Sequence, residues 1–531
     1  MTEIIIIGGG HNGLAAAFYL AKAGLKPTVF EQRDEVGGGA ITTELHPGFR
    51  CPTLTHHTPV WRDVAADMDL HRHGLEWLSP AVDVLAPRLE GPPLVLADDP
   101  ERTAQLLRPH SANDANAYAG YRSAITQVAA VLASQLQSPP PRIDGHDAGD
   151  LWRLLQTGYR VRRLGRQNAH RLLRWIPMPV ADLVSEWFES DSLRASIAAS
   201  GLSGTMLAPR SAGSALVLLL HEAHRLLAGG SRCVRGGPGV LASAMAASAR
   251  AAGADIHTGT RVDRIVVDNS RTTAVIVNGR EMPAGIVVSA VDPKTTYLKL
   301  VDAAELSPEF RSRIHHYRCA GSVAKVNLAL SGLPAFPIAN AGELSGRIHI
   351  GPDLDYLEHA FDDAKYGRLP EQPWLDVTIP SVLDPGLAPS GAHVMSIYAH
   401  YAPYSLRGDE WSHARDVLLD RVLAALEPYA PGLRALVVAA EVITPPDLEA
   451  HYGFHGGHIF HGELALDQLL ISRPLLGYSR YDSPVRGLYL CGAGTHPGGF
   501  LTGASGKLAA REIIASLGID NDRSPFSRRA I

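Results

Sequence analysis

The chain has 531 residues, of which 46% are hydrophobic and 19% are charged, and its formal net charge is −5 at neutral pH. A chain of this length can bury a large core and is expected to form two or three domains. Nucleic-acid-binding proteins usually carry a basic surplus, so this charge balance argues against a nucleic-acid partner. Apolar runs such as residues 215–220 are too short to span a bilayer, and no basic segment precedes the first expected strand at Glu3. These features predict a cytoplasmic protein without a signal peptide.

The cysteines and histidines give no sign of a redox disulfide or a metal site. The four cysteines lie far apart at positions 51, 233, 319 and 491, with no Cys-x-x-Cys pair, which suits a reducing compartment. The histidines show no metal-ligand spacing, and the dense group within residues 451–461 is interpreted as part of a loop. No metal is expected.

The N-terminal segment carries a dinucleotide-binding motif. A β-branched run, Ile4–Ile7, leads into Gly8, Gly10 and Gly13, and residues 14–23 read as a helix that ends at a glycine. The three glycines allow a tight turn, a close approach to a pyrophosphate and close helix–strand packing. A second strand ends at Glu31, whose carboxylate can accept hydrogen bonds from ribose hydroxyls. This context predicts a Rossmann-like unit that binds a dinucleotide.

The segment after Glu31 resembles the flavoprotein superfamily in which a glycine pair follows the ribose-binding acid. Residues 37–40 read Gly-Gly-Gly-Ala here, without the arginine that many members carry. Near the other end, residues 487–494 read as a strand and turn, and residues 502–514 as a helix. In the superfamily this helix points its N-terminus at the flavin, which an NAD dehydrogenase does not need. The resemblance therefore implies FAD.

The whole chain resembles the phytoene desaturase-like flavoproteins, in the branch of the carotene ketolases and the pyridine nucleotide-disulphide oxidoreductase domain-containing 2 type. The segments that carry the resemblance are residues 8–14, 185–190, 445–449 and 487–499. It implies an α/β fold with an FAD-binding Rossmann-like domain of the glutathione reductase/amine oxidase type, and an α+β substrate domain. It also implies an oxidoreductase that acts on a lipophilic or extended molecule.

Together the motif and the resemblance predict a set of residues along the FAD. Val262 matches the position whose backbone meets the adenine in the superfamily. A second dinucleotide fingerprint is missing, because the glycines between residues 229 and 239 follow no strand, so no pyridine nucleotide is expected. The FAD-binding prediction comprises Gly8, Gly9, Gly10, His11, Asn12, Gly13, Glu31, Gln32, Gly38, Gly39, Ala40, Val262, Gly492, Ala493, His496, Leu501, Thr502, Gly503 and Ala504.

The domain assignment follows from these pieces. The FAD-binding domain is expected to combine residues 1–89, 231–299 and 451–519, and the substrate domain residues 90–230 and 300–450. The first substrate segment reads as mainly helical, whereas the second mixes helices with strands near residues 322–330, 374–379 and 394–398. The polar tail, residues 520–531, is expected to be disordered.

Three residues are candidates for catalysis. Lys325 lies in an apolar strand similar to the amine-oxidase segment whose lysine holds a water beside the flavin; an exposed strand face is the alternative. His56 and His57 follow the stretch that passes near the flavin in the superfamily, and either could carry a proton. At most one of the two is expected to touch the cavity, since loop capping is the alternative for each.

The resemblance leaves several functions open. The first is a dehydrogenase or desaturase that removes a hydride and is reoxidised by oxygen or a quinone. Alternatives are an isomerase, ketolase or cyclase that acts on a polyene-like substrate, and a flavin-binding regulatory protein without turnover. Nothing in the sequence defines the oligomeric state.

A basic segment raises the question of membrane contact. Six arginines lie between Arg160 and Arg174, before the apolar stretch 175–180. One interpretation is a peripheral membrane patch at a portal for a lipophilic substrate. The other is a solvated helix face followed by a buried turn.

Overall fold

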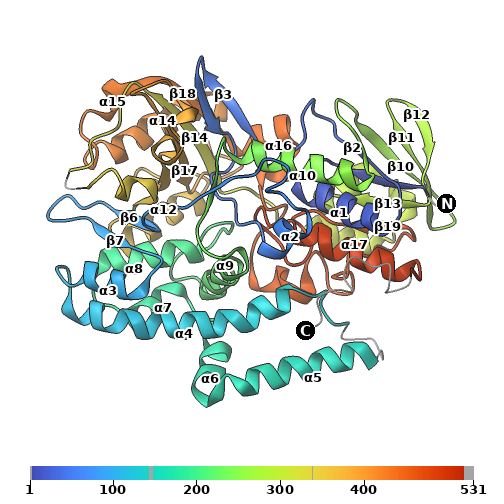
Figure 1. Cartoon of the computed structure of the whole chain (residues 1–531), viewed down its shortest axis with the longest axis horizontal. Helices are drawn as coiled ribbons and strands as arrows, with labels where there is room; N and C mark the ends of the chain where they lie inside the picture. The colour runs from blue at the N-terminus through green and yellow to red at the C-terminus, as the bar shows by residue number, and fades with distance from the viewer. Residues whose placement is uncertain (1–2, 143–147, 338, 520–531) are drawn as a thin grey trace.

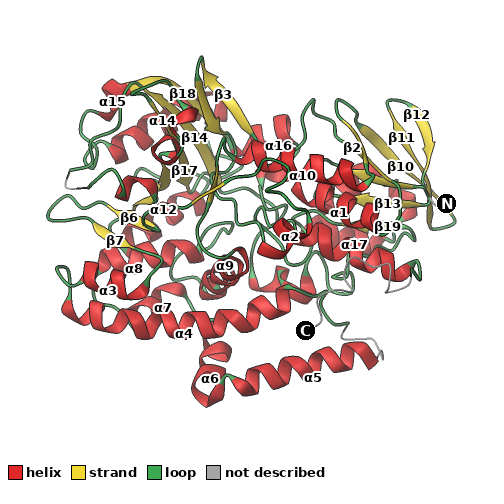
Figure 2. Cartoon of the chain, viewed as in Figure 1, coloured by secondary structure: helices red, strands yellow, loops and turns green. Residues whose placement is uncertain are grey.

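The computed structural model describes residues 3–142, 148–337 and 339–519, and the predicted tail 520–531 lies outside the described residues. Two main β-sheets, each covered by helices, lie side by side in the molecule (Figures 1 and 2). Among the described residues, no helix is both long and apolar enough to cross a membrane.

The first sheet is built from three distant parts of the chain. Its five strands run in the order β19-β13-β1-β2-β9, and all neighbouring pairs are parallel. This arrangement confirms the predicted Rossmann-like unit assembled from discontinuous segments. The strands are β1 (Ile4–Ile7), β2 (Pro27–Phe30), β9 (Asp255–His257), β13 (Ile286–Ser289) and β19 (Leu488–Leu490).

Strand β1 is buried on both faces because layers pack on either side of the sheet. Ile4 and Ile6 pack in a core with helices α1 (His11–Lys22), α10 (Pro238–Ala252) and α17 (Ala504–Ser516). Ile5 and Ile7 pack instead with a three-stranded antiparallel sheet. That sheet comprises β10 (Val262–Asp268), β11 (Arg271–Val277) and β12 (Arg280–Pro283), with the Asn278-Gly279 turn at positive φ between β11 and β12.

The second main sheet has seven strands in the order β18-β14-β17-β16-β15-β6-β7. Its central strands are antiparallel and include all three strands predicted between residues 322 and 398. Its strands are β6 (Val84–Ala86), β7 (Leu94–Leu96), β14 (Val323–Leu330), β15 (Arg347–Ile350), β16 (Trp374–Thr378), β17 (His393–His400) and β18 (Val437–Ile443).

The second sheet corrects one predicted boundary. Residues 1–89 are expected in the FAD-binding unit, but β6 pairs in parallel with β15 and antiparallel with β7. Residues 84–86 therefore lie with the large sheet. Short strands such as these carry too few residues for a sequence pattern to reveal their pairing partner.

The segment between residues 90 and 230 is mainly helical, as predicted. Its longest helix, α4 (Ala112–Leu136), ends just before the Ser138-Pro-Pro-Pro141 stretch. The other helices here are α3 (Pro100–Leu107), α5 (Ala148–Arg163), α6 (Gly165–Trp175), α7 (Val180–Ser185), α8 (Asp191–Ala198) and α9 (Ser214–Ala228).

The remaining elements connect the two sheets or cover their outer faces. The helices are α2 (Arg62–Asp67), α11 (Pro308–His316), α12 (Leu354–Lys365), α13 (Pro380–Leu383), α14 (Trp411–Leu426), α15 (Leu433–Leu436) and α16 (Pro445–Tyr452). The short strands are β3 (Thr42–His46), β4 (Phe49–Pro52), β5 (Trp77–Leu78) and β8 (Cys233–Val234). Short helical turns are η1 (Ala199–Gly201), η2 (Thr295–Leu300), η3 (Ala303–Glu305), η4 (Glu343–Ser345), η5 (Pro385–Leu387), η6 (His455–Gly457), η7 (Leu466–Gln468) and η8 (Leu470–Ser472).

Candidate active site

A long cavity joins the two sheets. It has a volume of about 660 Å³ and runs from Gly10, Glu31 and Val262 at the parallel sheet to Lys325 and Asp376 at the seven-stranded sheet. The parallel-sheet end lies at the carboxyl edge of β1 and β2, where doubly wound sheets bind their ligands. One cavity therefore connects the predicted nucleotide site with the predicted catalytic residues.

At the nucleotide end, Glu31 is fixed as a hydrogen-bond acceptor. Its side chain is buried, and its two carboxylate oxygens accept hydrogen bonds from the Gly9 amide (2.7 Å) and the Arg33 amide (3.0 Å). An ionised carboxylate has further lone pairs on each oxygen. Glu31 can therefore accept hydrogen bonds from ribose hydroxyls without losing these contacts with backbone amides.

The glycine motif fits a phosphate-bearing cofactor. A Cβ atom on Gly13 would lie 2.1 Å from the Gly8 carbonyl oxygen, so only glycine allows α1 to approach β1 this closely. Helix α1 has no acidic residue in its first turn and no side-chain cap at its N-terminus. The buried His11 Nε2 and Asn12 Oδ1 have no hydrogen-bond partner among the described residues, and both residues line the cavity. A helix start of this kind attracts an anion such as a diphosphate.

Most of the predicted FAD-binding residues line this cavity, but some do not. The residues that line it are Gly8, Gly10, His11, Asn12, Gly13, Glu31, Gln32, Gly38, Gly39, Val262, Ala493 and Leu501. The residues outside the lining are Gly9, Ala40, Gly492, His496, Thr502, Gly503 and Ala504.

His496 lies outside the cavity lining. Its ring is buried against the backbone around Gln135 and Leu136, at the end of α4, instead of facing the cavity. Gly492 packs against the end of β13, where a Cβ atom would lie 2.7 Å from the Ala290 carbonyl oxygen. These two residues shape the turn after β19, and the roles of the predicted FAD-binding set stay predictions.

At the other end, alternation along the strands makes one face of the seven-stranded sheet polar. Val326, Ile397 and Val377 point into the core beside α14. Their strand neighbours turn to the opposite face, where Lys325 of β14 and Asp376 of β16 both lie directly across from Tyr398 of β17. All three of these residues line the cavity.

Lys325 is buried, which excludes the alternative of an exposed strand face. Its side chain is only 2% exposed, and Nζ donates hydrogen bonds to Asn327 Oδ1 and Ser396 Oγ, both at 2.5 Å. Burial lowers the pKa of Lys325 to about 8, so the amine still carries its proton at neutral pH. A positive charge is thereby held at the cavity wall.

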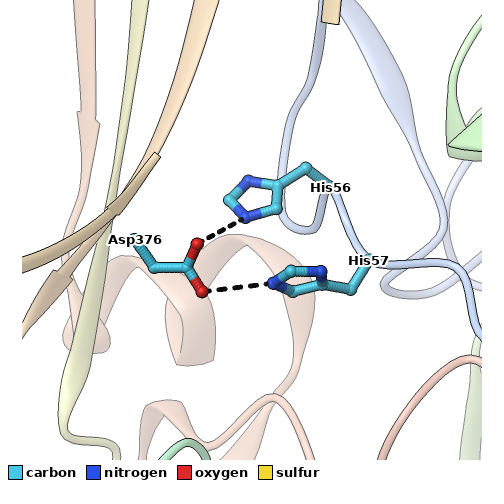
Figure 3. A group of neighbouring side chains, drawn as sticks. All are labelled: His56, His57 and Asp376. Carbon is cyan, nitrogen blue, oxygen red and sulfur yellow. Dashed lines mark hydrogen bonds and ion pairs between the residues drawn. The ribbon is translucent and has the colours of Figure 1, made fainter. Parts of the chain in front are cut away.

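His56 and His57 both reach the cavity, so the expectation that at most one would do so is wrong. They lie in the loop after β4 and point toward Asp376 from the same side (Figure 3). His57 Nε2 lies 3.3 Å from Asp376 Oδ2, and His56 Nε2 lies 3.7 Å from Asp376 Oδ1. Two adjacent residues can share one carboxylate here because the carboxylate presents two oxygens.

Hydrogen bonds define which tautomer His56 adopts. Its Nδ1 lies 3.0 Å from Ser396 Oγ, which already accepts a hydrogen bond from Lys325. The Ser396 hydroxyl is therefore free to donate to Nδ1, which leaves the His56 proton on Nε2, facing Asp376. Burial lowers the pKa of His56 to about 3, so the ring is neutral at physiological pH.

Asp376 and Arg347 were missed by the sequence analysis. Burial alone would raise the pKa of Asp376, but Arg347 Nη1, 3.3 Å from Oδ2, and the two histidines hold it well below its usual range. An ionised carboxylate is thus kept in the cavity wall. An acidic residue in the otherwise apolar strand Trp374–Thr378 was the signal that could have identified it.

His56, His57 and Asp376 form a group whose geometry must be compared with the expectation that no metal binds. One atom each from His56, His57 and Asp376 lie within 4.8 Å of one another, a geometry that could hold an ion. Arg347 already pairs with the carboxylate, and Lys325 adds a second nearby cation. This positive charge disfavours a divalent metal, and we interpret the group as a hydrogen-bonded cluster.

The fold and the cavity together are those of a protein that binds a dinucleotide. Residues 181–514 match the family of flavin-containing amine oxidoreductases, and residues 6–68 match the NAD(P)-binding Rossmann-like domain. The chain therefore belongs to the flavin-containing amine oxidoreductase family. It is an FAD-dependent oxidoreductase, as the sequence predicted.

Individual relatives cover nearly the whole chain. It is 35% identical to pyridine nucleotide-disulfide oxidoreductase domain-containing protein 2 of Rattus norvegicus, over 97% of this chain and 94% of that protein. It is 26% identical to the lycopene-forming phytoene desaturase of Pseudescherichia vulneris, over 98% of this chain and 100% of that enzyme. A solved oxidoreductase from Methanosarcina mazei has the same fold, with a TM-score of 0.62 at 16% identity, covering 97% of this chain and 100% of that one. The predicted resemblance is confirmed.

Proposed function

We propose that the protein removes a hydride from a lipophilic or extended substrate and passes the electrons to oxygen or a quinone. The observation that carries the proposal is the single cavity that joins the nucleotide site to the Lys325 face and continues along apolar and aromatic side chains. Among these are Ile197, Leu218, Phe460 and Phe500. The phytoene desaturase relative supports an apolar substrate.

Bound FAD would supply the two-electron acceptor, and the chain's own residues would position the reactants. Gly8–Gly13 and Glu31 would hold the diphosphate and ribose at one end. At the opposite end of the cavity, the Lys325 ammonium is fixed by Asn327 and Ser396, and it would hold a water and stabilise negative charge there.

The proton chemistry is assigned to the two histidines. His57 is 45% exposed at its side chain and contacts Asp376, so it can exchange protons between solvent and the cavity. His56 is held neutral and oriented by Ser396, and the Asp376 carboxylate stabilises either imidazole if it gains a proton. Lys325, His56 and His57 are thus the proposed catalytic residues.

The proposal is tested with the purified holoenzyme and phytoene under anaerobic conditions. We expect the flavin absorbance to bleach and the product to lose two hydrogens for each flavin reduced. A product of unchanged mass would indicate an isomerase or cyclase, and added oxygen in aerobic turnover a ketolase; either contradicts the proposal. If no apolar polyene bleaches the flavin, the result would favour the alternative of a flavin-binding regulatory protein without turnover.

A further inference from the structure

Helix α5 presents a stripe of large apolar side chains to solvent. Leu151, Trp152, Leu155 and Tyr159 are each between 58% and 61% exposed. Positions spaced by one, four and eight residues share one face of a helix. A helix on the surface of a globular protein normally turns this face toward the core, so this exposed stripe is a surface that something else can cover.

The polar side of α5 faces the protein instead. The buried Asp150 contacts the Arg480 guanidinium at 3.2 Å, and Thr157 Oγ1 donates a hydrogen bond to Gln135 of α4 at 3.1 Å. Asp150 and Thr157 are two turns apart and therefore on one side of the helix. The outward direction of the apolar stripe is fixed by these contacts.

Helices α5 and α6 form an arm along the lower margin of the molecule (Figure 1). The arm is anchored through α6, where Asn168 Nδ2 donates to Gln127 of α4 at 2.6 Å and Trp175 is buried in the core. Trp175 and Val180 are both buried, so the stretch 175–180 is a core turn and does not form the apolar surface that one sequence interpretation suggested. The exposed apolar surface lies on the preceding helix.

Unpaired positive charge accompanies the stripe. Arg160, Arg162, Arg163 and Arg166 are exposed, and none of them forms an ion pair with a carboxylate of the described residues. Arg174, farther along the arm, pairs with Glu186. The end of α5 and the start of α6 therefore carry a cluster of arginines that no described carboxylate neutralises, next to exposed leucine, tryptophan and tyrosine side chains. Arg163 also lies over the Tyr159 ring, 5.7 Å from its centroid.

We propose that the α5–α6 arm docks on an anionic lipid membrane. Trp152, Leu155 and their neighbours would enter the boundary between headgroups and acyl chains, and the arginines would contact lipid phosphates. Tryptophan and tyrosine favour this boundary because each combines an apolar ring with a polar group. The inference holds whichever substrate the cavity binds.

Other occupants fit the arm less well. A second copy of the chain meeting the same surface across a two-fold axis would bring its own free arginines against these, which is repulsive. A nucleic acid would pair with the arginines but leave the apolar stripe in water. Anionic lipid satisfies both features at once.

The test is co-sedimentation of the holoprotein with vesicles of phosphatidylcholine alone and of equal parts phosphatidylcholine and phosphatidylglycerol. We expect binding to the mixed vesicles, weakened by added salt. The W152E/L155E variant should lower the ratio of bound to free protein by about tenfold or more, because two apolar contacts are replaced by charges repelled by the lipid. Its FAD content should not change, since both residues are exposed.

A matched control is L89E, which changes a 67% exposed leucine in the turn between β6 and β7, away from the arm. This variant should bind vesicles like the wild type. The R160E/R163E variant should lose the preference for anionic vesicles. The proposal would be overturned if the wild-type protein bound neither type of vesicle. It would also be overturned if the W152E/L155E protein bound vesicles as well as the wild type. A wild-type dimer that becomes monomeric in W152E/L155E while neither protein binds vesicles would overturn it as well.

Discussion

Burial determines the chemistry of individual side chains in the cavity. Lys325, His56 and Asp376 are all less than 8% exposed, yet only Lys325 and Asp376 keep a charge at neutral pH. Asp376 keeps its charge because Arg347 and two imidazoles compensate burial, whereas the His56 ring lacks comparable compensation. The cavity wall therefore holds a fixed cation that is linked through Ser396 to a neutral imidazole, and a fixed anion that lies 3.7 Å from the same imidazole.

Glu31→Ala should weaken FAD binding by about ten- to a hundredfold. Hydrogen bonds that involve a charged group contribute about 1.5–3 kcal/mol, and this carboxylate is the acidic acceptor at the end of β2. The affinity is measured by titrating FAD into the apoprotein. The control is Glu35→Ala, which removes an exposed carboxylate four residues away that pairs with Arg33. Equal affinity of Glu31→Ala and wild type would place the ribose acceptor elsewhere.

Much of the fold could be predicted from single elements. The β-branched run Ile4–Ile7 and the glycine motif with its helix each have a local cause, and each has the predicted conformation. Alternation along β14 puts Lys325 and Asn327 on one face of the strand. Which side of the sheet faces the cavity depends on the packing of α14, which no local pattern encodes.

The less predictable parts of the site depend on long-range contacts. Asp376 contacts His57 across 319 residues of sequence, and the end of α4 meets His496 from a segment assigned to the other domain. Such contacts arise only when distant segments pack. For the same reason, the sequence could not show that α5 turns its apolar stripe outward.

Gly506→Ala should destabilise the packing of α17 on α1. A Cβ atom at Gly506 would lie 2.0 Å from the Asn12 carbonyl oxygen, so the two helices would have to separate. Overpacking of this kind costs about 1–3 kcal/mol of unfolding free energy, and FAD content should fall because α1 begins at the cavity. Chemical denaturation measures the loss.

Gly158→Ala provides the control for this substitution. Gly158 lies in α5 with open space where a Cβ atom would stand. Alanine favours a helix interior by up to about 1 kcal/mol over glycine, so this variant should be neutral or slightly stabilised. Unchanged stability in Gly506→Ala would show that the α1–α17 contact tolerates a side chain.

The glycines in the middle of the chain do not form a second nucleotide motif. Gly229 ends α9 and Gly237 precedes α10, and the strand between them, β8, has only two residues. We therefore expect NADH and NADPH to reduce the bound flavin slowly or not at all. Stopped-flow absorbance measures this, and rapid bleaching at micromolar NADPH would contradict it.

Across the whole molecule, buried neutral imidazoles make stability sensitive to acid. Burial lowers the pKa of each of these rings to about 3 or about 4, so they stay neutral in the folded protein. Unfolded histidine has a pKa near 6.5, so below that pH the unfolded chain binds more protons and folding loses about 1.4 kcal/mol per ring per pH unit. The histidines are His11, His56, His221, His224, His349, His400, His458, His461 and His496.

The thermal midpoint should therefore fall steeply as pH drops from 6.5 to 5, and change much less between pH 8 and 7. Flavin fluorescence on heating follows unfolding directly. A midpoint that stays level from pH 7.5 to 5 would mean that these histidines are protonated in the folded protein.

If the two units place the Lys325 face against the flavin ring, the Lys325 ammonium should control how fast oxygen reoxidises the reduced flavin. The rate at which oxygen reoxidises the photoreduced flavin is therefore compared between wild type and Lys325→Met. Methionine keeps much of the side-chain length but removes the charge, so we expect reoxidation to slow by about ten- to a thousandfold at normal FAD content. The wild-type rate should fall as pH rises through about 8, where Lys325 loses its proton. Lys365→Met, a change on α12 outside the cavity lining, should leave the rate unchanged. Lys325→Met protein that holds FAD and reoxidises at the wild-type rate would contradict the account.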